Sequence, residues 1–373
     1  MCEIVSLAKS QVALDGISGW PGYRVSPLHK LAGLAASCNV GEVFYKDESG
    51  RFGLKSFKAL GGSYAVAQQL IKAIEAATGV LPAMDDMFRK RYADIVTRLT
   101  VATATDGNHG RSVAWGAQLF GCACVIYIHA DVSSARERTM ADLGATVIRV
   151  SGNYDDSVRK VAAAATENAW IVVSDNSYPG YVQIPKDVSA GYTVMLCEVV
   201  DQLEGHIPTH VFIQGGCGGL AATVCGYFWE RWGEKRPRLI IVEPEQANCL
   251  QKSAMAGEMV IVDGKLETLM AGLACGEVSL LAWQILETGA DDFLTLPEQV
   301  VPVTMRLLAK GRGSDPAIEA GESAVAGAGV LLAVSDDQEA RAALGLSAES
   351  SVLVFGTEGA TDASLYAELI GHQ

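Results

Sequence analysis

The sequence has few charged residues and no long hydrophobic run, and both shortages limit what the protein can be. Only 19% of the 373 residues are charged, and 43 acidic residues against 29 basic ones give a net charge of −14. A uniformly acidic chain disfavours nucleic acid and anionic membranes as partners. No segment is long and apolar enough to span a bilayer, and the apolar stretch 323–334 fits a core helix better.

The nine cysteines contain no CxxC pair, and the chain shows no secretory signal peptide. The odd, scattered set favours buried, reduced thiols over zinc ligands, so we expect no metal site. Reduced cysteines and the missing leader together predict a cytoplasmic protein.

What the sequence does contain is an alternation of short apolar runs with helical stretches, and 49% of its residues are hydrophobic. The expected strands are 43–46, 99–102, 124–128, 146–150, 170–173, 210–214, 239–242 and 351–355. The expected helices are 58–75, 110–120, 133–143, 154–168, 190–203, 218–232, 280–289, 297–309 and 321–334. This order predicts an α/β fold with mostly parallel sheets covered by helices, with 81–94 as a surface excursion.

The run TDGNHG at 105–110 lies between an expected strand and an expected helix. Such a junction aims backbone N–H groups at whatever binds on the turn, and its glycines permit close approach. Asn108 can hydrogen-bond a ring oxygen of a ligand. Asp106 places a carboxylate beside this turn, which suggests proton transfer. His109 is expected to close the turn through backbone bonds rather than to act as a base.

Two lysines, Lys55 and Lys58, lie three residues apart at the expected start of a helix that begins with Ser56. A lysine near a helix start is electrostatically disfavoured. If such a lysine is desolvated, its pKa falls and its amine becomes free for Schiff-base chemistry. The alternative is a pair of solvated surface lysines.

The run QGGCGGLA at 214–221 also links a strand to a helix, and its glycines expose N–H groups that can hold a phosphate. Gly216, Gly218 and Ala221 also satisfy the dinucleotide pattern, and Glu243 closes the next strand, where an NAD enzyme keeps its ribose-binding acid. Alone, this run is equally consistent with a nicotinamide oxidoreductase.

Together, the three runs resemble the fold type II family of pyridoxal-phosphate enzymes, which includes threonine dehydratase, serine racemase and the tryptophan synthase β chain. Within it the chain looks most like the diaminopropionate ammonia-lyases. The blocks that carry this likeness follow in family order from Gly22 to about Asp362: YKDES, RFGL, TDGNHGR, NYDD, MAGLACGE, GES and TEG.

The resemblance implies two open, twisted, mostly parallel sheets flanked by helices. It implies a large cofactor-binding domain formed by 1–66 and 188–373, a small domain at 67–187, and a homodimer. The implied cofactor is pyridoxal 5'-phosphate, and the implied partner is a small amino-acid substrate.

The family's functional residues carry over to matching positions of this chain. Lys58 matches the Schiff-base lysine, Asn108 the partner of the ring hydroxyl, and Thr357 the hydroxyl facing the pyridine nitrogen. Asp106 and Asp175 match two proton-abstracting acids that would serve opposite enantiomers. Further cofactor contacts are Phe57, Gly215, Gly216, Cys217, Gly218 and Gly219, and substrate contacts are Ser56, Thr105, Asp106, Gly107 and His109.

The implied reaction is an α,β-elimination that converts D- or L-2,3-diaminopropionate to pyruvate and ammonia. Departures from the family pattern are Lys55 for a small polar residue, Tyr178 for a tryptophan, Gly356 for a serine, and an altered glycine run. They leave open another β-substituted amino acid, such as serine, 3-chloroalanine or hydroxyaspartate. A nicotinamide oxidoreductase and a non-catalytic pyridoxal-phosphate-binding protein are the alternatives from other classes.

Overall fold

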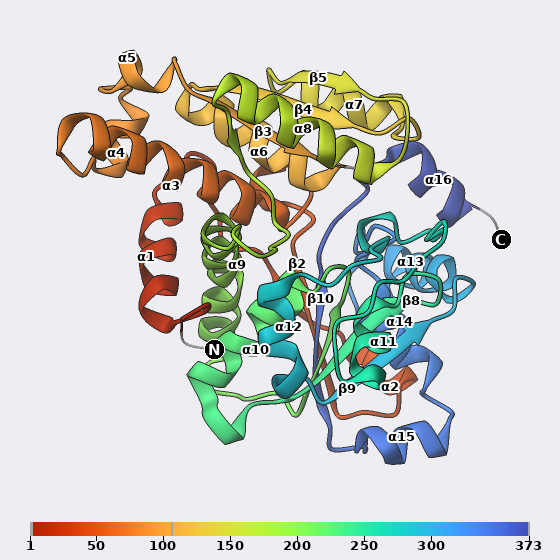
Figure 1. Ribbon diagram of the computed structural model, residues 1–373. Helices are drawn as coiled ribbons and strands as arrows, with labels where there is room; N and C mark the ends of the chain where they lie inside the picture. Colours follow the sequence, from red (N-terminus) through yellow and green to blue (C-terminus); the bar gives the residue numbers. More distant parts are fainter. Residues whose placement is uncertain (1–2, 106, 372–373) are drawn as a thin grey trace. The chain divides into compact units, whose positions relative to one another are not determined.

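The computed structural model describes residues 3–105 and 107–371, and these divide into two compact units (Figure 1). The first unit contains Arg24–Phe57 and Met195–Gln373 together with Met1–Ala8, as far as these are described. The second unit contains Lys9–Tyr23 and Lys58–Val194. The family resemblance predicts domain boundaries at 67 and 187, and these boundaries stay a prediction.

The first unit is built on a six-stranded sheet in the order β1-β2-β10-β7-β8-β9. Its strands are β1 (Leu28–Lys30), β2 (Glu42–Asp47), β7 (His210–Gln214), β8 (Arg238–Pro244), β9 (Asp292–Leu296) and β10 (Ser351–Gly356). Only the pairing of β1 with β2 is antiparallel among the described pairs. Strands β10 and β7 are buried along their whole length, as expected for parallel strands covered on both faces.

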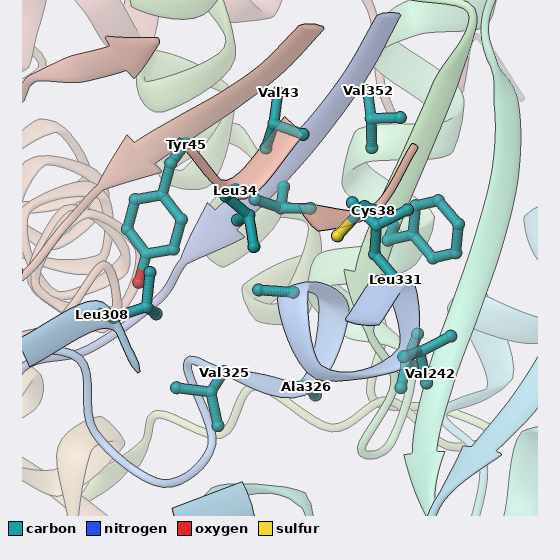
Figure 2. Packing of buried hydrophobic residues seen from close by; sticks show 14 of the residues in the cluster. Leu34, Cys38, Val43, Tyr45, Val242, Leu308, Val325, Ala326, Leu331 and Val352 are labelled. Atoms are coloured by element: carbon teal, nitrogen blue, oxygen red, sulfur yellow. The ribbon is translucent and has the colours of Figure 1, made fainter. Parts of the chain in front are cut away.

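Helices pack around this sheet and close its core. They are α2 (Ala32–Ser37), η1 (Arg51–Gly53), α10 (Gly219–Trp232), η2 (Gly233–Lys235), α11 (Cys249–Ala256), η3 (Ala271–Leu273), α12 (Leu280–Gly289), α13 (Val300–Lys310), α14 (Ala326–Ala333), α15 (Gln338–Leu344) and α16 (Ala363–Gly371). Figure 2 shows Leu34 of α2, Leu331 of α14 and Leu308 of α13 among the side chains gathered at one face of the sheet. Burial of this apolar cluster is the main stabilising term for the first unit.

The second unit is built on four parallel strands in the order β5-β4-β3-β6. They are β3 (Thr100–Ala104), β4 (Ala123–Ile128), β5 (Thr146–Arg149) and β6 (Ile171–Val172). The helices are α3 (Lys58–Thr78), α4 (Met84–Phe88), α5 (Ala93–Val96), α6 (Asn108–Phe120), α7 (Ser134–Ala141) and α8 (Tyr154–Asn168). Helix α8 covers the face formed by Ala102, Val125 and Tyr127, and the backbone N–H of Ser63 on α3 donates to Ser112 Oγ on α6 at 2.9 Å.

Helices α1 (Leu7–Ser18) and α9 (Gln183–Gln202) each have residues in both units. Helix α8 begins with a capping box formed by Asn153 and Asp156. The side chain of the preceding residue, Asp155, lies outside the described part of the chain. No helix among the described residues is long and apolar enough to cross a membrane.

The structure confirms the mostly parallel α/β architecture but corrects several element boundaries. Helix α3 begins at Lys58, where the expected range 58–75 begins, and not at Ser56, because Ser56 forms a bridge with Glu358 and Phe57 N donates to Thr357 O. The helix expected at 321–334 begins at Ala326, because Gly321 N donates to the backbone of Glu358. The excursion at 81–94 contains α4 and the start of α5.

Candidate active site

The carboxyl ends of three adjacent strands in the first unit lead into predicted site segments. Phe355 of β10 pairs with Lys46 of β2, and Val354 of β10 pairs with Phe212 of β7. The segment leading to Lys58 therefore follows β2, Thr357 follows β10, and the glycine turn follows β7. Ligands of open parallel sheets bind at this edge.

Lys58 is the first residue of α3, and its side chain is 24% exposed. The ammonium donates a hydrogen bond to the carboxylate of Asp175, 117 residues further along the chain. Its Nζ also lies 5.7 Å from the centre of the Tyr192 ring. The structure thus brings together the predicted Schiff-base lysine and one of the two predicted acids inside the second unit.

The turn at 105–110 is held by the hydroxyl of Thr105, which accepts hydrogen bonds from Gly107 N and Gly110 N, each at 3.1 Å. Asn108 opens α6, and His109 is buried behind it. Asp106, the other predicted acid, lies outside the described residues. The hydroxyl of Thr105 therefore links the end of β3 to the first residues of α6.

Asp175 follows β6 at the end of the second-unit sheet, and its side chain is 18% exposed. Burial raises the pKa of its carboxyl, but His109 and Lys58 outweigh this and hold that pKa well below its usual range. Nδ1 of His109 lies 3.7 Å from Asp175 Oδ2. The carboxylate is thus ionised at neutral pH, as a proton acceptor must be.

The glycine turn between β7 and α10 has the backbone of a phosphate cradle. Gly216 has a φ of +60° and Gly218 a φ of +93°, conformations that favour glycine. Gly218 is the N-cap of α10, with no side-chain hydrogen bond capping the helix. The N-terminal N–H groups of a 14-residue helix therefore suit an anion, and the residues present fit the phosphate of pyridoxal phosphate.

Thr357 follows β10 and is buried in the first unit. The amide of Gln214 approaches its hydroxyl at 3.4 Å. Two backbone carbonyls, Ala324 O at 2.9 Å and Phe355 O at 2.7 Å, fix which way this amide points, because both accept from Nε2. Gln214 was not among the predicted site residues, since a glutamine ending a buried strand is unremarkable in a sequence.

The structure explains one departure from the family pattern. A Cβ at Gly356 would overlap the buried ring of Tyr45, a residue of the neighbouring strand β2. The serine expected there would therefore clash with Tyr45. Lys55, another departure, forms an ion pair with Glu319 at 2.9 Å, and both side chains are more than 40% exposed, at 42% and 45%.

A buried ion cluster, formed by Lys46, Glu48, Arg51 and Glu198, lies in the first unit next to the segment that leads to Lys58. Arg51 donates to both acids, with its closest pairs at 2.7 Å, and Lys46 Nζ donates to Glu198 at 2.8 Å. All four side chains are at most 2% exposed. No spacing in the sequence reveals this cluster, because Glu198 lies 147 residues beyond Arg51.

Glu243, the residue that suggested a ribose-binding acid, caps a helix instead. Its carboxylate accepts hydrogen bonds from Leu250 N at 2.9 Å and Gln251 N at 2.7 Å, at the start of α11. The side chain is fully buried. Because both carboxylate oxygens are occupied by backbone donors, Glu243 is not available to a ribose, and the nicotinamide interpretation loses its acid.

The raised pKa of Glu243 predicts that the stability of the protein depends on pH. Burial raises its pKa to about 7 from a usual 4.5, although the two backbone donors lower it. The native protein then holds a proton that the unfolded chain has released between these pH values, so this contribution to stability falls as the pH rises from 4.5 to 7. We expect Glu243→Gln to flatten that slope in urea titrations at several pH values; parallel curves for the two proteins would contradict this assignment.

Comparison with known proteins gives three concordant findings. Residues 20–361 match the family described as "Pyridoxal-phosphate dependent enzyme". The chain is 40% identical over 354 residues to diaminopropionate ammonia-lyase of Escherichia coli K12, covering 94% of this chain and 88% of that one. The Salmonella typhimurium LT2 enzyme of that name is 36% identical over 359 residues, covering 94% and 89%.

Solved structures give the same match. The E. coli diaminopropionate ammonia-lyase in complex with an aminoacrylate-PLP azomethine reaction intermediate superimposes with a TM-score of 0.90, at 38% identity, covering 98% of this chain and 92% of that one. Maize serine racemase superimposes with a TM-score of 0.76 at only 16% identity, covering 99% and 98%. The second likeness shows a shared fold alone.

Proposed function

This chain belongs to the pyridoxal-phosphate dependent enzymes and, among them, to the diaminopropionate ammonia-lyases, and we propose that it eliminates ammonia from 2,3-diaminopropionate to give pyruvate. The reaction breaks a Cα–H bond and a Cβ–N bond, and the enamine product hydrolyses to pyruvate with release of a second ammonia. The observation that carries the proposal is the contact between Lys58 and the ionised Asp175 in the second unit.

Each proposed site residue has a task that its geometry supports. The amine of Lys58 would bind the cofactor, which when bound supplies an electron sink for the carbanion at Cα. The N–H groups of the turn formed by Gly215, Gly216, Cys217, Gly218 and Gly219 would hold the phosphate. Asn108 would contact the ring hydroxyl, and Thr357 the ring nitrogen.

The substrate would be held and deprotonated by residues around Lys58. Ser56 and the turn containing Thr105, Gly107 and His109 would position its carboxylate. Asp175 would accept the Cα proton of one enantiomer, and Asp106 that of the other. A proton acceptor on each face would let one enzyme process both hands of the substrate.

The two acids predict opposite losses. We expect Asp175→Asn to lower kcat/KM by roughly 10²- to 10⁴-fold for one enantiomer of 2,3-diaminopropionate and to spare the other. Asp106→Asn should show the reverse pattern. Pyruvate and ammonia are measured separately with the D and L substrates. If both variants lose activity on the same enantiomer, the two-base assignment is wrong.

A related substrate is the second candidate, because the E. coli relative has also been solved in complex with D-serine. Serine, 3-chloroalanine and hydroxyaspartate share the β-leaving group that an α,β-elimination requires. A substrate panel scored by pyruvate formation ranks these against D- and L-2,3-diaminopropionate. A protein that binds pyridoxal phosphate but releases no pyruvate from any of them would be a non-catalytic binder.

We further propose a cytoplasmic homodimer with a large domain at 1–66 and 188–373 and a small domain at 67–187. The family resemblance supports the dimer and the domains, and the odd, scattered set of nine cysteines with no CxxC pair supports the compartment. Sedimentation velocity tests the dimer, and cell fractionation tests the compartment.

A further inference from the structure

The imidazole of His109 lies between two hydrogen-bond acceptors in the second unit. Its Nε2 lies 2.9 Å from the backbone oxygen of Val173, and its Nδ1 lies 3.7 Å from Asp175 Oδ2. The residue is buried, with 7% of its surface exposed. Because a carbonyl oxygen and an ionised carboxylate can only accept, each favours an N–H on the ring nitrogen that faces it.

The two acceptors determine which nitrogens of the His109 ring carry a proton. The carbonyl of Val173 requires a proton on Nε2, so a neutral ring would turn the lone pair of Nδ1 toward the carboxylate of Asp175. Within the described part of the chain, Nδ1 has no hydrogen-bond partner. A second proton on Nδ1 replaces this repulsion by attraction between opposite charges.

The charges around Asp175 favour the same state when the amine of Lys58 binds the cofactor. Lys58 donates to the same carboxylate oxygen that faces His109. If the amine of Lys58 is used to bind the cofactor, Asp175 keeps His109 as its cation, and the pair is neutral overall. Among the described residues, Tyr181 is a further titratable group that faces Asp175, and burial raises its pKa, so its hydroxyl stays uncharged. It donates to Val172 O at 2.9 Å.

We propose that His109 is a positioning residue for the elimination: protonated on both ring nitrogens, it holds the carboxylate of Asp175 ionised and oriented toward the substrate. This inference rests on the proposed role of Asp175 as a proton acceptor. The direction of the Asp175 pKa, below its usual range, agrees with it. His109 acts through Asp175 and does not itself take the substrate proton.

Two variants separate this role from simple support of the turn. In His109→Asn the amide nitrogen can take the place of Nδ1 and still donate to Asp175. In His109→Gln the amide nitrogen can take the place of Nε2 and still donate to Val173 O. We expect the Gln variant to lose roughly 10- to 100-fold in kcat/KM for the enantiomer that Asp175→Asn affects, and the Asn variant to lose only a few-fold.

The enantiomer that Asp175 does not serve is the internal control, because a damaged fold would slow both. Equal losses on the two enantiomers in His109→Gln, or a greater loss in the Asn variant than in the Gln variant, would overturn the proposal. Circular dichroism and cofactor absorbance check that each variant is folded and loaded.

A second readout does not depend on turnover. The chain has six histidines, so ¹⁵N-histidine labelling gives a spectrum in which His109→Asn assigns the missing resonance. In the cofactor-loaded protein at pH 7 we expect both ring nitrogens of His109 to be protonated, and Asp175→Asn to leave a neutral ring protonated only at Nε2. An unprotonated Nδ1 in the wild-type protein would overturn the proposal even if the lyase activity is confirmed. Absence of pyruvate release would instead refute the proposed function and leave the spectrum to decide on His109.

Discussion

Lys58→Ala is expected to abolish turnover, lowering pyruvate release from both enantiomers by roughly 10³-fold or more, because the only amine aimed at Asp175 among the described residues is removed. The protein mixed with pyridoxal phosphate should also lose the visible absorbance band that a lysine-bound cofactor gives. Asp175 would lose the ammonium of Lys58, so its pKa would rise toward the usual range. Absorbance and coupled pyruvate assays measure both effects.

Lys55→Ala is the matched control, three residues earlier on the same segment. Its partner Glu319 is 45% exposed, and such an exposed ion pair contributes only about 0–1 kcal/mol. We expect Lys55→Ala to keep the absorbance band and most of the activity. If the band and the turnover follow Lys55 and survive the loss of Lys58, the assigned lysine is the wrong one.

Much of the fold could be predicted because its signals are local in the sequence. The strand expected at 210–214 is β7 residue for residue, and the helix expected at 280–289 is α12. These segments are strongly apolar and bounded by turn residues, so burial and propensity agree. Strand β9 escaped prediction because its residues are mostly only half-buried, and the short helix α2 escaped because six residues carry little periodicity.

The candidate site divides in the same way. The glycine spacing predicts the turns at 105–110 and 215–219, and the residues next to Lys58 in the sequence identify it as the candidate lysine. Contacts between residues that lie far apart in the sequence leave no local signal. The family resemblance predicted that Asp175 is a site residue, but nothing in the sequence predicted that it contacts Lys58. Gln214 and Glu198 were not predicted at all, because their importance depends on which strands and helices become neighbours in three dimensions.

Glu198→Ala is expected to destabilise the protein by about 3–5 kcal/mol, because it leaves Lys46 and Arg51 buried with one carboxylate instead of two. Burial alone would raise the pKa of Glu198, but Arg51 and Lys46 hold it below its usual range, so the carboxylate is charged in the fold. Urea denaturation followed by circular dichroism measures the loss. Asp85→Ala is the control, since its pair with Arg89 is 67% and 65% exposed and should contribute less than about 1 kcal/mol.

The buried ion cluster also predicts a departure from additivity. Glu198→Ala alone leaves the cluster with one excess positive charge, and Arg51→Met alone leaves one excess negative charge. The double variant leaves only Lys46 and Glu48, which balance, so it should be less destabilised than the sum of the single variants by roughly 0.5–3 kcal/mol. Additive losses would mean that these residues act by packing and not by charge. Because Arg51 begins the segment in which Phe52 and Lys55 have φ values of 49° and 56°, the single variants should also loosen the backbone that delivers Lys58, and amide exchange over 51–57 should rise with the loss of stability.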